Sequence, residues 1–507
     1  MSTIQQIINA MGARSTNAWD MVCCYNEDRV NHIFNEKYKK NTLCAKVVLE
    51  GYCNIPFSGK IKFECELALR APEIQFSTGK DKHCTLNMPI MGGFARFTDS
   101  GGKVEQEEIP ADILRIVCNA PLAAASGDLD EIHDGSKPIV FAGGEVTQKY
   151  VFLHFKNTAG TTYSIEPLPE QEIAAKDLLI YQEYIRSDII KTIETFFKEE
   201  VSEIDYSLGS LRNEPTAGTL SLTPKSFIFS ISDAEPNNEK SQPSLNLYIQ
   251  SVESGNATGD LAPSFQPGGT VLAPIAEGYT AALIISGRFF EQLMKKTMNE
   301  YQPSDPIKHE KNAFANNLTL TGIVSCSGYH RDANHYFKGL SIDISKKPFT
   351  FEIKTIPTGQ GFDVKGRLTY QSEEVKGYYA NWDHCAGEMM GGEGYLYASF
   401  SIIKEFPLTF RDNGVISFSV QISPSDVTVS TKVKPSRGGW TIDEKPIEDQ
   451  LKKDIPNKVE KLEFHMDGIS TFITTNLLFP EDNYFSFKSG DKYYLPYDLI
   501  AFGYMTD

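Results

Sequence analysis

Histidine, cysteine and carboxylate side chains lie close together in the sequence at two places that could bind a metal ion. His330 and His335 are five positions apart, and Asp383, His384 and Cys385 are consecutive. Structural zinc sites usually contain a pair of cysteines with two to four residues between them, and neither group has such a pair. We therefore expect neither a metal site nor a cofactor.

The sequence also lacks the motifs that most often mark a hydrolytic or nucleotide-binding site. It has no Gly-x-Ser-x-Gly elbow, no glycine-rich loop ending in Lys-Ser or Lys-Thr, and no His-Glu-x-x-His. Asp426, Asp443, Glu444 and Glu448 are more typical of a solvated acidic surface than of a catalytic pair. We predict that the chain is not an enzyme, and a hydrolytic enzyme is the remote alternative.

Length and charge limit the classes of partner. The 507 residues are enough for about two to four domains, and a hydrophobic share of 41% is ordinary for a globular chain. With 66 acidic and 49 basic residues, the net charge is −17. Such a chain is repelled by phosphate backbones and by anionic lipid surfaces, so we expect no nucleic-acid partner.

The sequence gives no sign of a membrane span or a secretion signal. Its longest apolar runs, such as residues 281–285, are far shorter than the roughly 20 residues of a transmembrane helix. The N-terminus has no basic region followed by an apolar core. Nine scattered cysteines, an odd number, are typical of buried reduced thiols. We expect a cytoplasmic protein, and release without a conventional signal peptide stays open.

The elements that position these residues begin with an apolar strand and a capped helix. Residues 19–26 form an apolar extended run, and the helix that follows has Val30, Ile33 and Phe34 on one face. The Asn26 side chain can accept a hydrogen bond from a free N–H of the first helical turn. The positive end of the helix dipole favours the carboxylates of Glu27 and Asp28 in that turn. We predict a strand followed by a helix that Asn26 caps.

This unit occurs twice in the sequence. Without a gap, Trp19 aligns with Tyr279 and Asn26 with Ser286, an offset of 260 positions. The segment 254–270 is rich in Gly, Pro, Ser and Asn, which is typical of a boundary. We therefore predict two copies of one architecture, residues 1–262 and 263–507.

The rest of the first half predicts antiparallel strands and one long helix. Residues 60–69 alternate strictly between apolar and polar side chains, and further strands are expected at 84–89, 113–117, 151–155, 220–231 and 245–252. Apolar residues three to four apart predict a helix over residues 171–201. At about 1.5 Å per residue it would span about 45 Å, so we expect a strongly twisted sheet to curl around it.

The second half repeats this order. Strands are expected at residues 340–344, 349–353, 394–402 and 415–422. Ile447, Leu451 and Ile455 are four apart and predict a helix that Pro456 ends. A last short helix is expected from Ile469 onward.

The apolar helix faces are candidates for a groove that binds lipid, although such faces more often form plain core. Bulky residues such as Phe34, Phe197 and Phe290 tend to fill such a groove, whereas Met294 and Met298 can leave a channel in the second half. The candidate lining residues are Phe290, Leu293, Met294, Met298, Ile33, Phe34, Ile185, Ile189 and Ile193.

Three segments carry a resemblance to a known family. They are Asn17 to Val22 with the Val30-Asn31 pair of the first helix, residues 71–76 and 86–90, and residues 472–480 and 495–503. In these segments the chain resembles the clostridial neurotoxin-cluster accessory proteins, the OrfX group and the forty-seven-kilodalton protein, of the tubular lipid-binding (TULIP) superfamily. The length favours an OrfX-type member.

The resemblance implies an α+β fold of two TULIP-like modules, each a long helix wrapped by a strongly curved antiparallel sheet. It also implies a non-enzymatic accessory protein of a bacterial toxin gene cluster. Of the two readings, we favour an interaction scaffold that binds sibling toxin-cluster proteins. The alternative is a lipid-binding or transfer protein that holds an acyl chain in an apolar groove. A homo-oligomer stays open.

Overall fold

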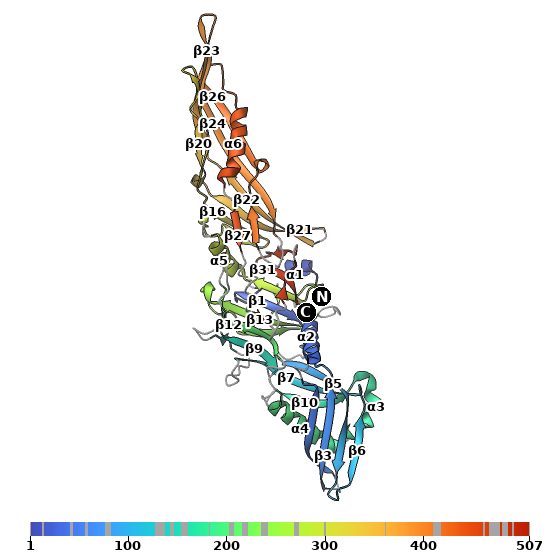
Figure 1. Cartoon of the computed structure of the whole chain (residues 1–507). Coiled ribbons are helices and arrows are strands. Elements are labelled where there is room, and N and C mark those ends of the chain that lie inside the picture. Colours follow the sequence, from blue (N-terminus) through green and yellow to red (C-terminus); the bar gives the residue numbers. More distant parts are fainter. Residues whose placement is uncertain are drawn as a thin grey trace.

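A central antiparallel sheet joins two long arms in the computed structural model (Figure 1). The fold is mixed α/β with mostly strands, and both ends of the chain lie beside the central sheet. The structure describes residues 2–12, 15–40, 44–55, 59–76, 83–126, 137–141, 147–153, 161–181, 183–201, 207–214, 222–234, 242–267, 273–298, 301–359, 361–408, 417–459, 462–465, 477–478, 485–488 and 491–505.

The central sheet combines strands from both halves of the sequence. Its order is β29 (Phe485–Ser486), β31 (Leu499–Met505), β14 (Ala281–Ile285), β1 (Met21–Asn26), β13 (Ser244–Ser251), β12 (Pro224–Ser232) and β8 (Ile139–Val140), with β30 (Tyr493–Tyr494) on β31. All residues of β1, β13 and β14 are buried. The predicted strands 220–231 and 245–252 are confirmed by β12 and β13, and residues 220–221 lie outside the described part.

The order of the central sheet is symmetric about β1 and β14. The two strands pair antiparallel, and Cys23 lies opposite Leu283, the residue 260 positions later. On its other side β1 pairs with β13, and β14 pairs on its other side with β31; both pairs are antiparallel. A local twofold axis therefore passes between Cys23 and Leu283.

Hydrogen bonds around this axis occur in equivalent pairs. The N–H of Ser286 donates to the carbonyl of Asp20 at 2.8 Å, and that of Asn26 donates to the carbonyl of Thr280 at 3.1 Å. The Asp20 carboxylate accepts from Ser251 N–H at 2.9 Å, and the Thr280 hydroxyl accepts from Met505 N–H at 2.7 Å. Asp20 and Thr280 are again 260 positions apart, so this pattern of hydrogen bonds repeats at the offset of the sequence repeat.

Both predicted capped helices are confirmed. Helix α2 (Glu27–Lys39) follows β1, and the Asn26 side chain accepts from Arg29 N–H at 3.0 Å. Helix α5 (Gly287–Thr297) follows β14, and the Ser286 hydroxyl accepts from Phe289 N–H at 3.2 Å. Each cap satisfies an N–H that has no partner within the helix.

The N-terminal arm is a ten-stranded antiparallel sheet (Figure 1). Its main order is β2 (Lys46–Ile55), β3 (Gly59–Leu69), β5 (His83–Thr98), β7 (Leu114–Ser126), β9 (Gln148–Leu153), β11 (Ser207–Arg212) and β28 (Leu477–Leu478). Strands β4 (Glu73–Gln75) and β6 (Val104–Ile109) pair with β5, and β10 (Thr162–Pro167) pairs with β7.

Strand β3 confirms the alternation predicted for residues 60–69, because its odd-numbered residues from Ile61 to Leu69 are buried. The predicted strands 84–89, 113–117 and 151–155 correspond to β5, β7 and β9, with residues 154–155 outside the described part.

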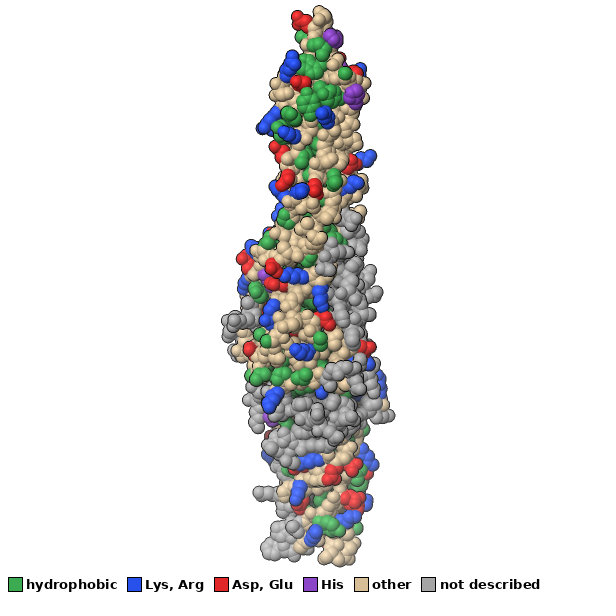
Figure 2. Space-filling model, turned by 90° about the vertical axis from the view of Figure 1, so that its left-hand side faces the viewer, with side chains coloured by type: hydrophobic (Ala, Val, Ile, Leu, Met, Phe, Trp, Pro, Cys, Tyr) green, Lys and Arg blue, Asp and Glu red, His purple; other side chains and the backbone are tan. Residues whose placement is uncertain are grey.

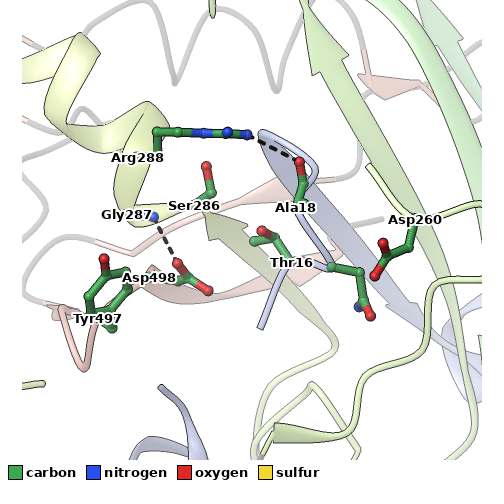
Figure 3. A pocket seen from close by; sticks show the side chains of 9 residues that line it. Thr16, Ala18, Asp260, Ser286, Gly287, Arg288, Tyr497 and Asp498 are labelled. Carbon is green, nitrogen blue, oxygen red and sulfur yellow. Dashed lines mark hydrogen bonds between the residues drawn. The ribbon is translucent and has the colours of Figure 1, made fainter. Parts of the chain in front are cut away.

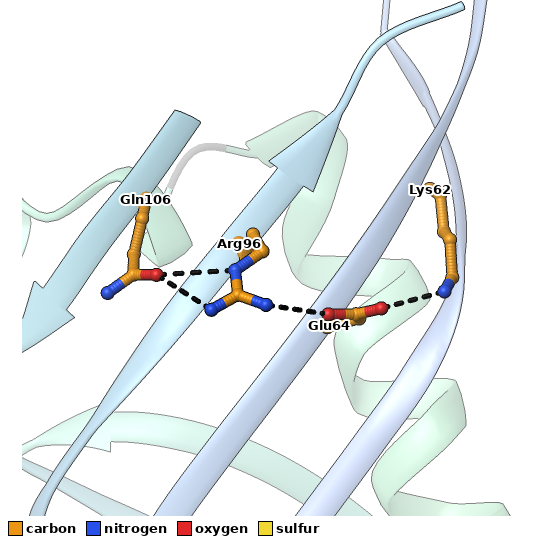
Figure 4. Close-up of polar contacts among 4 residues, drawn as sticks. All are labelled: Lys62, Glu64, Arg96 and Gln106. Carbon is orange, nitrogen blue, oxygen red and sulfur yellow. Dashed lines mark hydrogen bonds and ion pairs between the residues drawn. The ribbon is translucent and has the colours of Figure 1, made fainter. Parts of the chain in front are cut away.

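On the outer face of this sheet, Glu64 accepts from Lys62 at 2.7 Å and from Arg96 at 3.3 Å, and Arg96 donates to Gln106 at 3.1 and 3.2 Å (Figure 4). These contacts connect β3, β5 and β6 side by side.

The single helix predicted over residues 171–201 is wrong. The segment consists of two 3₁₀ turns, η1 (Pro169–Gln171) and η2 (Leu179–Tyr181), and two helices, α3 (Glu172–Lys176) and α4 (Glu183–Glu199). Helix α3 ends at Lys176, and Leu178 N–H donates to the carbonyl of Ala175, only three residues earlier. The next N–H, that of Leu179, donates to the Glu107 carboxylate of β6 at 2.7 Å. These two hydrogen bonds lie outside the α-helical pattern, in which each N–H donates to the carbonyl four residues earlier, and they mark the break between α3 and α4.

The C-terminal arm is a nine-stranded antiparallel sheet. Its main order is β15 (Lys308–Glu310), β16 (Ala313–Leu318), β21 (Phe349–Thr358), β22 (Gly361–Gln371), β24 (Glu388–Pro407), β23 (Val375–Cys385), β19 (His335–Phe337) and β18 (Tyr329–Asp332), with β26 (Val427–Gly438) on β24. Two separate two-stranded antiparallel sheets accompany it, β17 (Ile323–Cys326) with β20 (Leu340–Asp343) and β25 (Ser417–Val420) with β27 (Leu462–His465).

The strands predicted at 340–344, 349–353 and 394–402 are confirmed by β20, β21 and β24. The strand predicted at 415–422 is confirmed by β25, and residues 415–416 lie outside the described part.

Helix α6 (Lys445–Lys458) packs against β17 and β26. It continues two residues beyond Pro456, so the predicted stop is wrong. A proline near the end of a helix removes only its own N–H bond, and Val459 N–H still donates to Ile455. The last helix, predicted from Ile469, lies outside the described residues.

Aromatic rings fill the inner face of the C-terminal arm. The rings of Phe349 and Tyr370 stack with centroids 4.1 Å apart, and Phe400 lies 5.4 Å from Tyr370. Phe351 stacks on Phe406 at 5.9 Å. In the N-terminal arm, where α4 packs against β2 and β10, Phe197 of α4 stacks on Tyr163 at 5.6 Å.

All nine cysteines are free thiols, and seven of them are buried, as the sequence predicts. Burial raises the pKa of the Cys65 and Cys118 thiols to about 12, so both stay protonated. Among the described helices, none combines the length and apolar character needed to cross a bilayer. A short helix, α1 (Ile4–Ala10), completes the N-terminus.

Candidate functional site

A cavity of about 530 Å³ lies at the start of α5, where segments from both halves meet (Figure 3). Four segments contribute to it: the turn before β1, the stretch after β13, the first turn of α5 and the residues before β31. Its lining residues are Thr16, Asn17, Ala18, Asp260, Ser286, Gly287, Arg288, Tyr497 and Asp498.

Asp498 connects the N-terminal segment to α5. Its carboxylate is buried, and its two oxygens accept from Gly287 N–H and Ser15 N–H, both at 2.8 Å. The carboxylate therefore satisfies a free N–H in the first turn of α5 and faces the positive end of its dipole. The protein's own carboxylate occupies the position where a helix can otherwise bind an anion.

Burial raises the pKa of Asp498 from 3.8 to about 6. The hydrogen bonds from Gly287 and Ser15 and the nearby His309 oppose this rise, because they favour the charged form. Asp498 is consequently close to half-protonated in mildly acidic solution.

Tyr497 lines one side of the cavity, and His309 packs against its ring. Their rings stack with centroids 4.2 Å apart, and His309 also contacts Glu291 of α5 and the carbonyl of Tyr497, 3.0 Å from Nε2. A Cβ on Gly287 would lie 2.5 Å from the His309 ring. The absence of a side chain at Gly287 is what lets the two rings pack on the helix.

The opening motif connects the other side of the cavity to the segment between the halves. The Trp19 indole donates to the carbonyl of Asp260 at 3.0 Å, and the Asn17 amide donates to the carbonyl of Ser264 at 2.8 Å. The buried Asp20 carboxylate also accepts from the Asn256 amide at 2.6 Å. The predicted boundary segment is therefore hydrogen-bonded to the residues that open the repeat.

Asn17 and Ala18 adopt left-handed backbone conformations, with φ of 51° and 64°. For alanine this conformation costs about 1–2 kcal/mol. The contacts around it oppose that cost: Trp19 N–H donates to Thr16, and Arg288 donates to the Ala18 carbonyl at 3.4 Å. The polar groups of the cavity wall are thus hydrogen-bonded to other groups of the protein, an arrangement typical of a structural junction.

We expect Gly259→Ala to destabilise this junction. A Cβ at residue 259 would lie 2.4 Å from Trp19 Cδ1 and 2.7 Å from the Asn17 carbonyl oxygen. Because the indole and a backbone atom must move, the free energy of unfolding should fall by about 1–3 kcal/mol. Denaturant titration measures it. Gly12→Ala, where the added Cβ meets no atom within 4 Å, is the matched control, and equal small effects of the two would contradict the expectation.

The candidate groove residues of α2 and α5 lie in the apolar core. Ile33 and Phe34 of α2 are at most 2% exposed. Phe290, Leu293 and Met294 of α5 and the adjoining Met298 are at most 1% exposed, and Phe290 packs edge-on against Phe314 of β16 at 5.3 Å. Both helices adjoin the central sheet (Figure 1). Helix α2 also packs against β4 of the N-terminal arm, and α5 contacts β16 of the C-terminal arm through Phe290, so the two helices lie where each arm meets the central sheet.

On α4, Ile189 and Ile193 are buried and Phe197 continues their row, whereas the side chain of Ile185 lies outside the described part. The equivalent row on α6, Ile447, Leu451 and Ile455, is buried in the C-terminal arm and was absent from the predicted set. A signal for it existed, because each of these residues follows its α4 counterpart by 258 positions. The helix of the second arm that corresponds to α4 is thus α6.

The two clusters with metal-ligand chemistry lie at the far end of the C-terminal arm. His335 contacts Asp332 at 2.9 Å and Asp383 at 3.0 Å. In the described residues, no group of three or more His, Cys, Asp and Glu side chains has the geometry to hold a metal ion. Hydrogen bonds with His335 and Asn334 lower the pKa of Asp332, as in an ordinary surface ion pair.

No protein-family model matches the chain, and no curated protein matches it by sequence. Among solved structures, P47 from Clostridium botulinum A2 is 13% identical with a TM-score of 0.45, over 97% of this chain and 98% of that chain. P47 of Clostridium botulinum E1 is 14% identical with a TM-score of 0.48, over 96% and 99%. A lipopolysaccharide binding protein is 8% identical with a TM-score of 0.27, also over 96% and 99%. The structural similarity to these proteins extends over nearly the full length of the chain.

Proposed function

We propose that the chain is a non-enzymatic scaffold that binds sibling proteins encoded in a toxin gene cluster. The class of partner comes from the resemblance of its opening and closing segments to OrfX-type proteins. In this proposal residues 1–262 and 263–507 are two TULIP-like modules, each an arm plus its share of the central sheet.

The observation that carries the proposal is that the protein's own side chains fill the space between helix and sheet in the arms. In the N-terminal arm, Ile193 and Phe197 of α4 are fully buried, and Phe197 stacks on Tyr163 of β10. An acyl chain needs a channel free of protein atoms along several turns, and side chains in mutual contact leave none at those points. Filled arms favour action through the outer surface.

The outer surface offers apolar contacts in both arms. Tyr52 and Val48 of β2 are at least 50% exposed, and Met389, Met390 and Trp440 at the far end of the C-terminal arm are 42–49% exposed. Exposed aromatic and methionine side chains are enriched at protein interfaces. A long molecule with such surfaces at both ends can hold two partners apart or together.

Mixing experiments with the individual sibling proteins test this function. Each purified sibling is combined with the full chain and analysed by sedimentation velocity. We expect at least one sibling to form a complex that sediments faster than either component. Failure of every sibling to do so, with each protein shown to be folded, would contradict the scaffold function.

A further inference from the structure

Four tyrosines form a continuous row on the outer face of the C-terminal arm near its far end. They come from three neighbouring strands: Tyr336 from β19, Tyr378 from β23, and Tyr395 and Tyr397 from β24. Successive ring centroids are 5.9, 5.6 and 6.5 Å apart. Their rings are partly exposed, so the row is a surface feature and not core.

Lysines lie over these rings. The ammonium of Lys338 is 5.8 Å from the Tyr378 centroid, that of Lys376 is 4.7 Å from Tyr395, and that of Lys434 is 4.8 Å from Tyr397. Lys432 lies opposite Tyr397 in the register of β24 and β26. We name the four tyrosines and these four lysines the tyrosine–lysine face.

The four lysines of this face are not engaged in ion pairs with carboxylates in the part of the chain that the structure describes, although the chain as a whole has a charge of −17. The neighbouring Glu393 accepts from the Tyr378 hydroxyl at 2.7 Å. Figure 2 shows hydrophobic side chains, tyrosine included, beside Lys and Arg near the upper end of the molecule, the end that the C-terminal arm forms in Figure 1.

We propose that the tyrosine–lysine face is the docking surface for an acidic, extended segment of a partner protein. The inference rests on the proposed function and states the chemistry of the partner. Lys432 and Lys434 are two residues apart on β26, so their side chains repeat at about 7 Å. Alternate carboxylates of an extended segment repeat at the same interval, and tyrosine rings supply contact area at low entropic cost.

Charge favours a short acidic segment over a long polyanion. Screening limits the attraction of the lysines to about 8–10 Å, so a short segment meets only this basic face. A nucleic acid or an anionic bilayer extends beyond it and meets the acidic remainder of the chain, which repels it. These two classes of ligand are therefore outcomes that oppose the proposal.

The test measures binding of fluorescein-labelled octaglutamate to the full chain by fluorescence anisotropy. We expect binding at about 0.05 M salt that weakens strongly at about 0.5 M. The double variant Lys432→Gln/Lys434→Gln should bind about threefold to thirtyfold more weakly, the loss of two exposed charge contacts. Lys452→Gln/Lys453→Gln on α6 makes the same charge change in the same arm and should have little effect.

A second pair of variants tests the rings. Tyr395→Ser should weaken octaglutamate binding, because it removes a ring between two neighbours of the row. Tyr52→Ser removes an exposed ring in the N-terminal arm that also carries a lysine, Lys60 at 4.4 Å, and should not.

The proposal fails if octaglutamate does not bind at low salt, or if the two double variants lose affinity equally. It also fails if phosphatidylserine vesicles or a single-stranded oligonucleotide bind more tightly than octaglutamate through the same lysines. A sibling protein that binds Lys432→Gln/Lys434→Gln as tightly as the unchanged chain would overturn this inference and leave the scaffold function intact. If no sibling protein forms a complex but octaglutamate still binds, the scaffold function would be overturned and the tyrosine–lysine face would remain an acidic-segment site.

Discussion

Ile193→Ala is expected to lower the free energy of unfolding by about 2–5 kcal/mol, the range for truncating a large side chain in dry core. Ile193 of α4 has no exposed surface, and Ile189 beside it is 1% exposed. Leu451→Ala on α6 should have an effect of the same size, because Leu451 occupies the equivalent position in the other arm and is also fully buried. Denaturant midpoints at unchanged slope measure both effects.

Ile403→Ala is the matched control, since Ile403 lies on β24 and is 51% exposed. It should change stability by about 0.5 kcal/mol or less. A near-zero effect of Ile193→Ala would mean that α4 faces a channel rather than packed side chains. The same result for Leu451→Ala alone would place such a channel in the C-terminal arm.

The protein should become more stable as the pH falls from about 7.5 to about 5. Burial raises the pKa of Glu27 to about 7 and that of Asp498 to about 6, from ordinary values of 4.5 and 3.8. Both groups therefore bind a proton more tightly in the folded chain than in the unfolded chain. Their stabilisation is complete below about pH 4 and is lost as the pH rises through about 6 and 7. Together they should contribute about 2–4 kcal/mol between pH 5 and pH 7.5.

Glu27 is the first residue of α2, and its carboxylate accepts from Phe76 N–H at 2.5 Å. Glu27→Gln should remove at least half of this pH dependence, measured as the free energy of unfolding at several pH values. Glu105→Gln, at a side chain 65% exposed, is the control and should leave it unchanged. Carboxylates whose pKa is lowered, such as those of Asp363 and Asp426, stabilise the folded chain in their charged form, and this stabilisation is lost only below the pH range of this experiment. A stability that is flat or falls on acidification to pH 5 would refute the expectation.

The sequence predicts well what depends on local pattern. The caps at Asn26 and Ser286 and the buried face of β3 follow from residue type and spacing alone. The repeat at an offset of 260 also predicts that Asp20 and Thr280 occupy equivalent positions, and their hydrogen bonds agree with this.

Other features depend on contacts between distant residues. In the break before α4, Leu179 N–H donates to the carboxylate of Glu107, which is 72 positions away. The junction cavity requires Asp498, which bonds to residues 211 and 483 positions away. The equivalence of α4 and α6 was readable from spacing, but it appears at an offset of 258 rather than 260, and an ungapped match therefore misses it.

Extraction of the purified chain with organic solvent, followed by mass spectrometry, tests the central claim that the arms are filled by protein. A bound acyl chain gains about 0.8 kcal/mol for each buried methylene, so lipid held in a true channel survives purification. The account predicts that the extract contains far less than one lipid per chain, with an extract of a known lipid-carrying protein as the positive control. Recovery of one lipid or more per chain would contradict it and would make lipid binding the function of the arms.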